Sequence, residues 1–234
     1  MLSEKLKAVQ DQVAAAIDRS GDSHKVQLIA ITKTHSPETI IEAYNAGIRV
    51  IGENRIQEAT IKFPHLVNYS DLTRRMIGHL QTNKINKCLE WFDTLDSIDS
   101  LKLAKKINKK LKEEDRILPA LLEINTSGES TKSGFDSENM DDLLACVDQS
   151  QLNVEGLMTI GPLTQEESAI RKSFRMLYAL REKLNDQLAP DKQLHELSMG
   201  MSGDFEIAIE EGSTMIRLGT ALFGTRKPYP PPNA

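Results

Sequence analysis

The stretch that decides the fold runs from Val26 to Gly47 and reads VQLIAITKTHSPETIIEAYNAG. Its first seven residues are aliphatic or β-branched apart from Gln27, and this predicts a short buried strand. Ser36 and Pro37 then have the residue types of an N-cap and a first helical position, and Gly47 ends the helical pattern. The segment therefore predicts a strand, a helix and a crossover long enough to bring the next strand back parallel.

The same alternation continues along the chain. A leading helix with an apolar residue every three or four positions ends near Ser20-Gly21. Further strands are predicted at 50–53, 76–79, 94–98, 118–125, 154–160, 195–199 and 215–223, and helices from 54, around 87–89, from 100, at 137–147, 165–188 and 206–210. Eight strand–helix units predict a (β/α)8 TIM-type barrel, an α/β fold, with an extra N-terminal helix. The alternative is a doubly wound open sheet, but the glycine fingerprint that would favour it does not follow the first strand.

The length and composition fit one compact barrel. The chain has 234 residues and is 39% hydrophobic, and barrels of this kind typically have about 250 residues. Because no segment rich in Pro or Gly divides the chain, we expect one domain over residues 1–228. Residues 229–234, with three consecutive prolines, are expected to form a loose tail.

Charge and hydropathy exclude several classes of protein. The chain carries 29 basic and 34 acidic residues, for a net charge of −5, whereas a general nucleic-acid binder is normally basic. No apolar run approaches the roughly 18–20 residues that cross a bilayer. The first residues lack the features of a signal peptide, so the cytoplasm is the expected location. Cys88 and Cys146 form no C-x-x-C pair and are expected to be core residues.

Lys33 is the first candidate for chemistry. In a parallel barrel the active site lies at the carboxyl ends of the strands, and Lys33 follows the first strand directly. Burial and nearby cations lower the pKa of a lysine amine and make it a nucleophile towards carbonyl groups. From position alone, a solvated lysine at a strand end is the more common case. Lys84 and Lys132 are competitors, but both lie in polar stretches.

A second group of candidates follows the last two strands. Ser202 and the pair Gly219-Thr220 lie in short loops rich in small residues, and such loops leave backbone N–H groups open to an anion such as phosphate. The alternative is that these glycines only make turns. The five histidines show no metal-binding spacing, so no metal is expected. Neither a nucleophile elbow nor a nucleotide-binding P-loop occurs in the sequence.

Several motifs together resemble one family. They are LIAITKT at 28–34, GENRIQE at 52–58, IGHLQTNK at 77–84, KSG at 132–134, GLMTI at 156–160, LSMGMSGD at 197–204 and GSTMIRLGTALFG at 212–224. These stretches, which extend over nearly the whole chain, are similar to those of the pyridoxal phosphate homeostasis protein family. The resemblance implies the barrel of the alanine racemase N-terminal domain, with pyridoxal 5′-phosphate (PLP) as cofactor.

The resemblance also implies a role for each site residue. Lys33 is expected to form a Schiff base with the cofactor aldehyde, and Arg217 to face the pyridine nitrogen. The phosphate is expected at Ser202, Gly219 and Thr220, with Asn54 and Met199 lining the ring. The implied function is to hold PLP and contribute to intracellular vitamin B6 homeostasis and supply, without robust catalysis. PLP-dependent apo-enzymes are the expected recipients, and a monomer is expected.

Two other functions remain open from the sequence. A PLP-dependent amino-acid racemase needs a second acid/base group, which two-domain racemases take from a tyrosine of an additional β domain. We expect no such domain after Phe223, and the four tyrosines fall in helix, loop, helix and tail. An arginine beside the pyridine nitrogen also discourages protonation of that nitrogen and weakens the electron sink that racemisation uses. The other possibility is a barrel that binds a different phosphorylated metabolite.

One segment departs from the family pattern. Family members often have Trp-His-Phe before the Ile-Gly of the third strand, and this chain has Arg74-Arg75-Met76 there. The sequence leaves open how two arginines are accommodated beneath the third strand.

Overall fold

Eight parallel strands close into a barrel in the computed structural model, which describes residues 1–21, 23–127 and 133–225. The barrel strands are β1 (Gln27–Ile31), β2 (Val50–Glu53), β3 (Thr73–Met76), β4 (Thr94–Ile98), β5 (Leu118–Asn125), β7 (Leu152–Met158), β8 (Glu196–Met201) and β9 (Met215–Leu218). Each strand pairs with its neighbour in chain order, β9 pairs with β1, and pairing of β4 with β5 completes the circle. The short β6 (Phe135–Asp136) adds to the end of β5. The predicted TIM-type barrel is confirmed.

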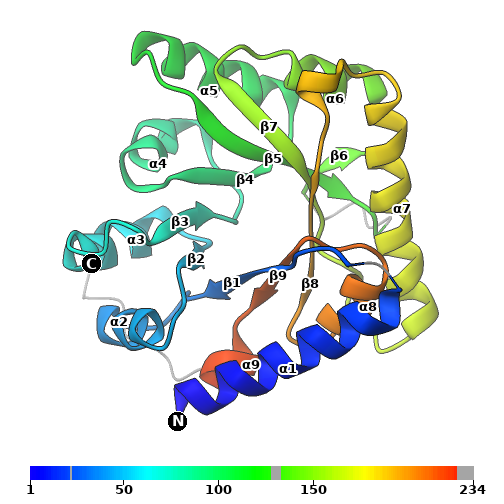
Figure 1. Cartoon of the computed structure of the whole chain (residues 1–234). Coiled ribbons are helices and arrows are strands. Elements are labelled where there is room, and N and C mark those ends of the chain that lie inside the picture. The colour runs from blue at the N-terminus through cyan, green and yellow to red at the C-terminus, as the bar shows by residue number, and fades with distance from the viewer. Residues whose placement is uncertain (22, 128–132, 226–234) are drawn as a thin grey trace.

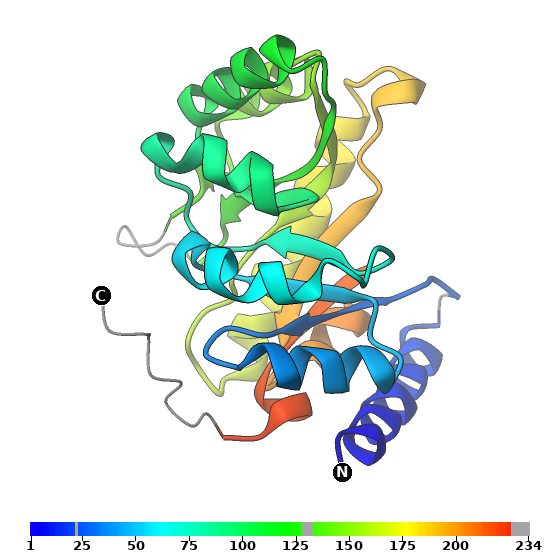
Figure 2. The same cartoon turned by 90° about the vertical axis from the view of Figure 1, so that its left-hand side faces the viewer.

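Helices surround the barrel, as Figure 1 shows. They are α1 (Leu2–Ser20), α2 (Pro37–Asn45), α3 (Ile56–Lys62), α4 (Ile85–Trp91), α5 (Leu101–Glu113), α6 (Met140–Val147), α7 (Glu167–Asn185), α8 (Phe205–Glu210) and α9 (Thr220–Phe223). The described residues also contain three short 3-10 helices, which are η1 (Phe63–Leu66), η2 (Thr82–Lys84) and η3 (Pro190–Lys192). In Figure 2, α2 to α5 lie along one side of the barrel. The leading helix α1 packs against α8 and α9 and ends at Gly21, whose φ is 73°.

Local sequence explains where most of these elements begin and end. Ser100 caps α5 by accepting a hydrogen bond from the backbone N–H of Leu103 at 3.3 Å. Gly47, with φ of 109°, allows the turn after α2 that an L side chain would strain. Inside the barrel, a Cβ at Gly52 would lie 2.9 Å from Ile31 Cδ1, so any larger residue there would require the Ile31 side chain to move.

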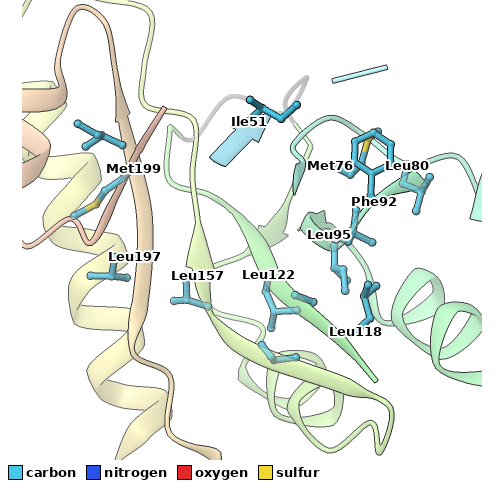
Figure 3. Packing of buried hydrophobic residues seen from close by; sticks show 14 of the residues in the cluster. Ile51, Met76, Leu80, Phe92, Leu95, Leu118, Leu122, Leu157, Leu197 and Met199 are labelled. Carbon is cyan, nitrogen blue, oxygen red and sulfur yellow. The ribbon is translucent and has the colours of Figure 1, made fainter. Parts of the chain in front are cut away.

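Alternating residues of the strands build two apolar cores. The larger core fills the space between the outer faces of the strands and the helices, and Figure 3 shows part of it. A smaller cluster lies inside the barrel and contains Ile29, Ile31, Val50, Leu121, Met158 and Met215. In β1, for example, Ile29 and Ile31 face inward and Ala30 faces the helices. This alternation fixes which residues of each strand point towards the barrel axis.

The third strand lies three residues earlier than predicted. It was expected at 76–79 but spans Thr73–Met76, because ion pairs make the two arginines compatible with a strand. Arg74 pairs with Asp93 at 3.1 Å, and Arg75 pairs with Asp96 at 2.7 Å. The departure from the family pattern is therefore accommodated by carboxylates on or beside the next strand. As a result, His79 stands beyond the strand end rather than at it.

The last strand is shorter than predicted. It was expected at 215–223, but it ends at Leu218, and Thr220–Phe223 form the short helix α9. Shifts of one or two residues separate the predicted bounds of β1, β7 and β8 from the observed ones, and the predicted bounds of β2, β4 and β5 coincide with the observed ones.

Within the described residues, no helix combines the length and the apolar character that crossing a membrane requires. The expected tail at 229–234 and the competitor Lys132 lie outside the described residues. The prediction of one domain over 1–228 therefore stays a prediction.

Candidate functional site

Lys33 lies in the tight turn that follows β1 and is half-buried. Strand β1 pairs with β9 in a register that places Ala30 beside Leu218. At the end of β9, Gly219 lies beside β1, where a Cβ on it would be in ordinary contact with Ile31 Cβ at 3.7 Å. Lys33 and the Gly219-Thr220 turn thus leave adjacent strands at the same end of the barrel.

Ser202 brings β8 into the same corner. Its hydroxyl oxygen accepts hydrogen bonds from the backbone N–H groups of Gly219 at 3.3 Å and Ala221 at 3.1 Å. Two backbone N–H groups at the start of α9 therefore point to the Ser202 hydroxyl oxygen, and the exposed Thr220 lies between these donors in the chain. This arrangement of small residues and N–H groups suits a phosphate oxygen.

Arg217 lies below this corner and is 5% exposed. Its Nη1 donates to the carbonyl oxygen and the hydroxyl of Ser198, both at 2.7 Å, and its Nη2 donates to the carbonyl oxygen of Thr159 at 2.6 Å. Burial lowers the pKa of Arg217, while the carboxylates of Asp96, Asp204 and Glu123 oppose that change. Because an arginine side chain is not deprotonated in proteins, this guanidinium remains a cation inside the barrel mouth.

Glu123 is a functional candidate that the sequence analysis missed. It shares the inward face of β5 with Leu121 and is 6% exposed. Burial raises its pKa to about 7, with Asp99 acting in the same direction and Arg217 and His79 against it. His79 Nδ1 in turn lies 2.7 Å from Asp99 Oδ2. In the sequence, Glu123 is visible as a single acidic residue in the apolar run Leu121-Leu122-Glu123-Ile124. The structure adds that Leu121, two positions earlier, faces inward.

The two residues expected to line the ring have different surroundings. Asn54 follows β2 and borders a cavity of about 520 Å³ that Thr34, His79 and Lys84 also line. The side chain of Met199 is fully buried in the outer core with Leu197 (Figure 3). Because Ser198 contacts Arg217 inside the barrel, its neighbour Met199 must point outward. Asn54 therefore lies at the barrel mouth, whereas the side chain of Met199 does not.

The structure shows where the competing lysine Lys84 and three of the four tyrosines lie. Lys84 ends η2 and borders the same cavity as Asn54, so it is a valid competitor for an aldehyde. Tyr44 lies in α2, Tyr178 lies in α7, and Tyr69 lies in a turn after η1. Tyr229 falls outside the described residues. No tyrosine among the described residues follows a barrel strand.

The fold and this corner define a class of protein. Residues 5–227 match the family described as alanine racemase, N-terminal domain. An alanine racemase of Clostridium difficile shares the fold with a TM-score of 0.72 at 14% identity, and the match covers 92% of this chain and 60% of the racemase. The class is therefore the barrel domain of the alanine racemase type.

Closer relatives identify the family within that class. The chain is 39% identical over 226 residues to the pyridoxal phosphate homeostasis protein of Aquifex aeolicus, a match that covers 96% of this chain and 98% of the relative. The structure of PipY from Synechococcus elongatus with PLP bound has a TM-score of 0.85 at 36% identity, and the match covers 96% of this chain and all of PipY. The chain belongs to the pyridoxal phosphate homeostasis protein family.

Proposed function

We propose that this chain binds PLP at the barrel mouth and holds it through Lys33 as a store that supplies other proteins. The observation that carries the proposal is the convergence of Lys33, Ser202 and Gly219 from three neighbouring strands, with the Arg217 guanidinium beneath them. PipY, a relative that this chain matches over its whole length, is described with PLP bound. We also propose a cytoplasmic location and a monomer.

The residues present fit the chemical groups of PLP. The phosphate would accept from the hydroxyl of Ser202 and from the backbone N–H groups of Gly219 and Ala221, which donate to that hydroxyl oxygen in this structure and would turn to the phosphate on binding. The Lys33 amine would replace the aldehyde oxygen of PLP, with release of one water. Thr220 would close the phosphate side, and Asn54 would lie beside the ring.

The environment of the ring argues for a carrier rather than an enzyme. Bound PLP supplies an electron sink that stabilises carbanions, and protonation of the ring nitrogen strengthens this sink. Arg217 is a permanent cation and does not donate a proton readily, so it would leave the ring nitrogen unprotonated. The described tyrosines also lie away from the strand ends, where a racemase would need its second acid/base group. We therefore propose that catalysis is not the main function.

Reduction with borohydride tests the proposed attachment. Protein incubated with PLP is expected to be yellow, and borohydride would convert the C=N bond to a stable secondary amine on the peptide that contains Lys33. Lys33→Ala should abolish this labelling, whereas the matched control Lys84→Ala should retain it. Label on Lys84 or Lys132 alone, or a colourless protein at saturating PLP, would overturn the assignment.

Two further measurements separate a carrier from a racemase. Loaded protein mixed with an apo-transaminase should activate it, and a trap for free PLP would show whether the transfer needs direct contact. Exchange of the α-proton of alanine with deuterated water should be slow. Exchange faster than about 1 s⁻¹, a rate typical of enzymes, would refute the carrier function.

A further inference from the structure

A buried lysine lies directly behind the turn that carries Lys33. Lys62, at the end of α3, is 1% exposed, and its ammonium donates three hydrogen bonds. The acceptors are the carbonyl oxygen of Thr32 at 2.9 Å, Glu53 Oε1 at 2.9 Å and Glu58 Oε2 at 2.8 Å. A lysine ammonium has three donors, so Lys62 is saturated.

The same network holds both neighbours of Lys33. The Thr32 hydroxyl donates to Glu53 Oε1 at 2.7 Å, and the backbone N–H of Thr34 donates to Glu58 Oε2 at 2.8 Å. The residue before Lys33 is therefore fixed to Lys62 and Glu53, and the residue after it is fixed to Glu58, which Lys62 joins to the same network. None of these bonds involves the Lys33 side chain itself.

Thr34 shows why the turn needs this support. Its φ of 67° lies in the left-handed region, which a β-branched residue rarely adopts. Such a conformation persists only where surrounding contacts hold it, and the bond from Thr34 N to Glu58 is one of these contacts. Loss of the network would let the turn relax and would move the base of the Lys33 side chain.

The pKa values of the two carboxylates in the network shift in opposite directions. Glu53 is fully buried, and burial raises its pKa, with Lys62 acting against that change. For Glu58, burial is outweighed by the hydrogen bonds from Lys62 and Thr34, which keep its pKa below the ordinary value. Glu58 is thus the carboxylate that stays ionised, and Lys62 is the cation that keeps it beside the turn.

We infer that Lys62, Glu53 and Glu58 are positioning residues that set the direction of the Lys33 amine towards the Ser202 and Gly219 corner. The inference rests on the proposed function, in which Lys33 joins the PLP aldehyde. The network acts through the backbone of Thr32 and Thr34 and leaves the phosphate corner untouched. It therefore affects ligands that bond to Lys33 and spares ligands that only use the phosphate and ring contacts.

The test compares two ligands that differ only at the aldehyde. PLP can bond to Lys33, whereas pyridoxine 5′-phosphate carries an alcohol there and cannot. Lys62→Met should weaken PLP binding at least tenfold and slow the appearance of the lysine-linked absorbance, while pyridoxine 5′-phosphate affinity changes less than threefold. Glu58→Gln, which keeps an acceptor for Thr34, should show a smaller loss with the same preference. Thr60→Ala, on the same helix but bonded only within it, is the matched control and should change neither affinity.

A second measurement works without any cofactor. Competitive acetylation followed by mass spectrometry reports the reactivity of the Lys33 amine against pH in the protein alone, and Lys62→Met should shift this profile while Thr60→Ala should not. Should Lys62→Met fail to fold, Glu58→Gln retains the Lys62–Glu53 pair and allows both measurements. Equal losses for the two ligands, or an unchanged Lys33 profile, would overturn the inference. Wild-type protein that binds pyridoxine 5′-phosphate but never links PLP would instead refute the proposed function.

Discussion

Arg75 Nε donates to Asp96 Oδ2 at 2.7 Å inside the barrel, where Arg75 is 5% exposed and Asp96 is fully buried. Asp96 also accepts from the hydroxyl of Thr94 at 3.0 Å. Arg75 Nη2 is buried without a hydrogen-bond partner among the described residues. The pair joins β3 to β4 and places a charge where neighbouring barrel strands contribute apolar side chains.

Removal of Arg75 should therefore be costly. Arg75→Met leaves the buried Asp96 carboxylate without its cation, and we expect a loss of about 3–5 kcal/mol in the free energy of unfolding. Urea denaturation measures this loss. Arg74→Met is the matched control, because the Arg74–Asp93 pair is partly exposed and its loss should cost below about 1 kcal/mol. The double variant Arg75→Met with Asp96→Asn should recover part of the loss, and equal effects of the two single variants would contradict the prediction.

Glu123 should make stability depend on pH. Its pKa is raised to about 7 in the folded protein by burial, so the folded state retains a proton that the unfolded state has lost. Between about pH 4.5 and 7 this group makes the protein less stable as the pH rises, by about 1–3 kcal/mol in total. Glu123→Gln should remove this slope and stabilise the protein at pH 8. Urea denaturation at pH 5.5 and pH 8 checks it, and an unchanged slope in the variant would exclude Glu123 as the cause.

Replacement of Ser202 should weaken the binding of ligands that carry a phosphate and leave the binding of other ligands unchanged. Ser202→Ala removes the hydroxyl that accepts from Gly219 and Ala221, and one hydrogen bond to a charged group corresponds to about a tenfold change in affinity. We therefore expect PLP to bind about tenfold more weakly by absorbance titration. Pyridoxal, which has no phosphate, is the control ligand and should bind equally to both proteins. A matching loss for pyridoxal would place the phosphate elsewhere.

Cys88 and Cys146 should be inert in the native protein. Both are buried, and burial raises the pKa of each thiol to about 12. Since the thiolate is the reactive form, a thiol-specific reagent at pH 8 should modify neither residue until the protein is unfolded. The measurement is the release of chromophore with and without guanidinium chloride. Rapid labelling of one thiol in the native protein would show that its helix opens locally.

Much of the fold could be predicted from local patterns. The runs at 50–53, 94–98 and 118–125 coincide with the observed strands β2, β4 and β5. The prediction missed the start of β3, because Arg74 and Arg75 resemble loop residues until their carboxylate partners are known. It also extended β9 through α9, because Thr220-Ala221-Leu222-Phe223 suits a strand as well as a short helix.

Part of the candidate site could likewise be predicted from the sequence, and part of it could not. Lys33, Ser202 and Gly219 were identified from strand ends and small residues, and the structure places them in one corner. Met199 was expected beside the ring, but the pleat of β8 turns it outward. Glu123 was missed because one acidic residue in an apolar strand has no meaning until the inward face is known.

By itself, the sequence determined the barrel and the order of its eight strands, because periodicity and turn residues act over a few neighbours. The resemblance of its motifs identified the family. The tertiary structure alone decided which charges are buried. Lys62 and Glu58 form an i, i+4 pair that the sequence would place on a solvated helix face, yet Lys62 is 1% exposed. A buried charge depends on partners that distant segments supply, and here they are Thr32, directly after β1, and Glu53 in β2.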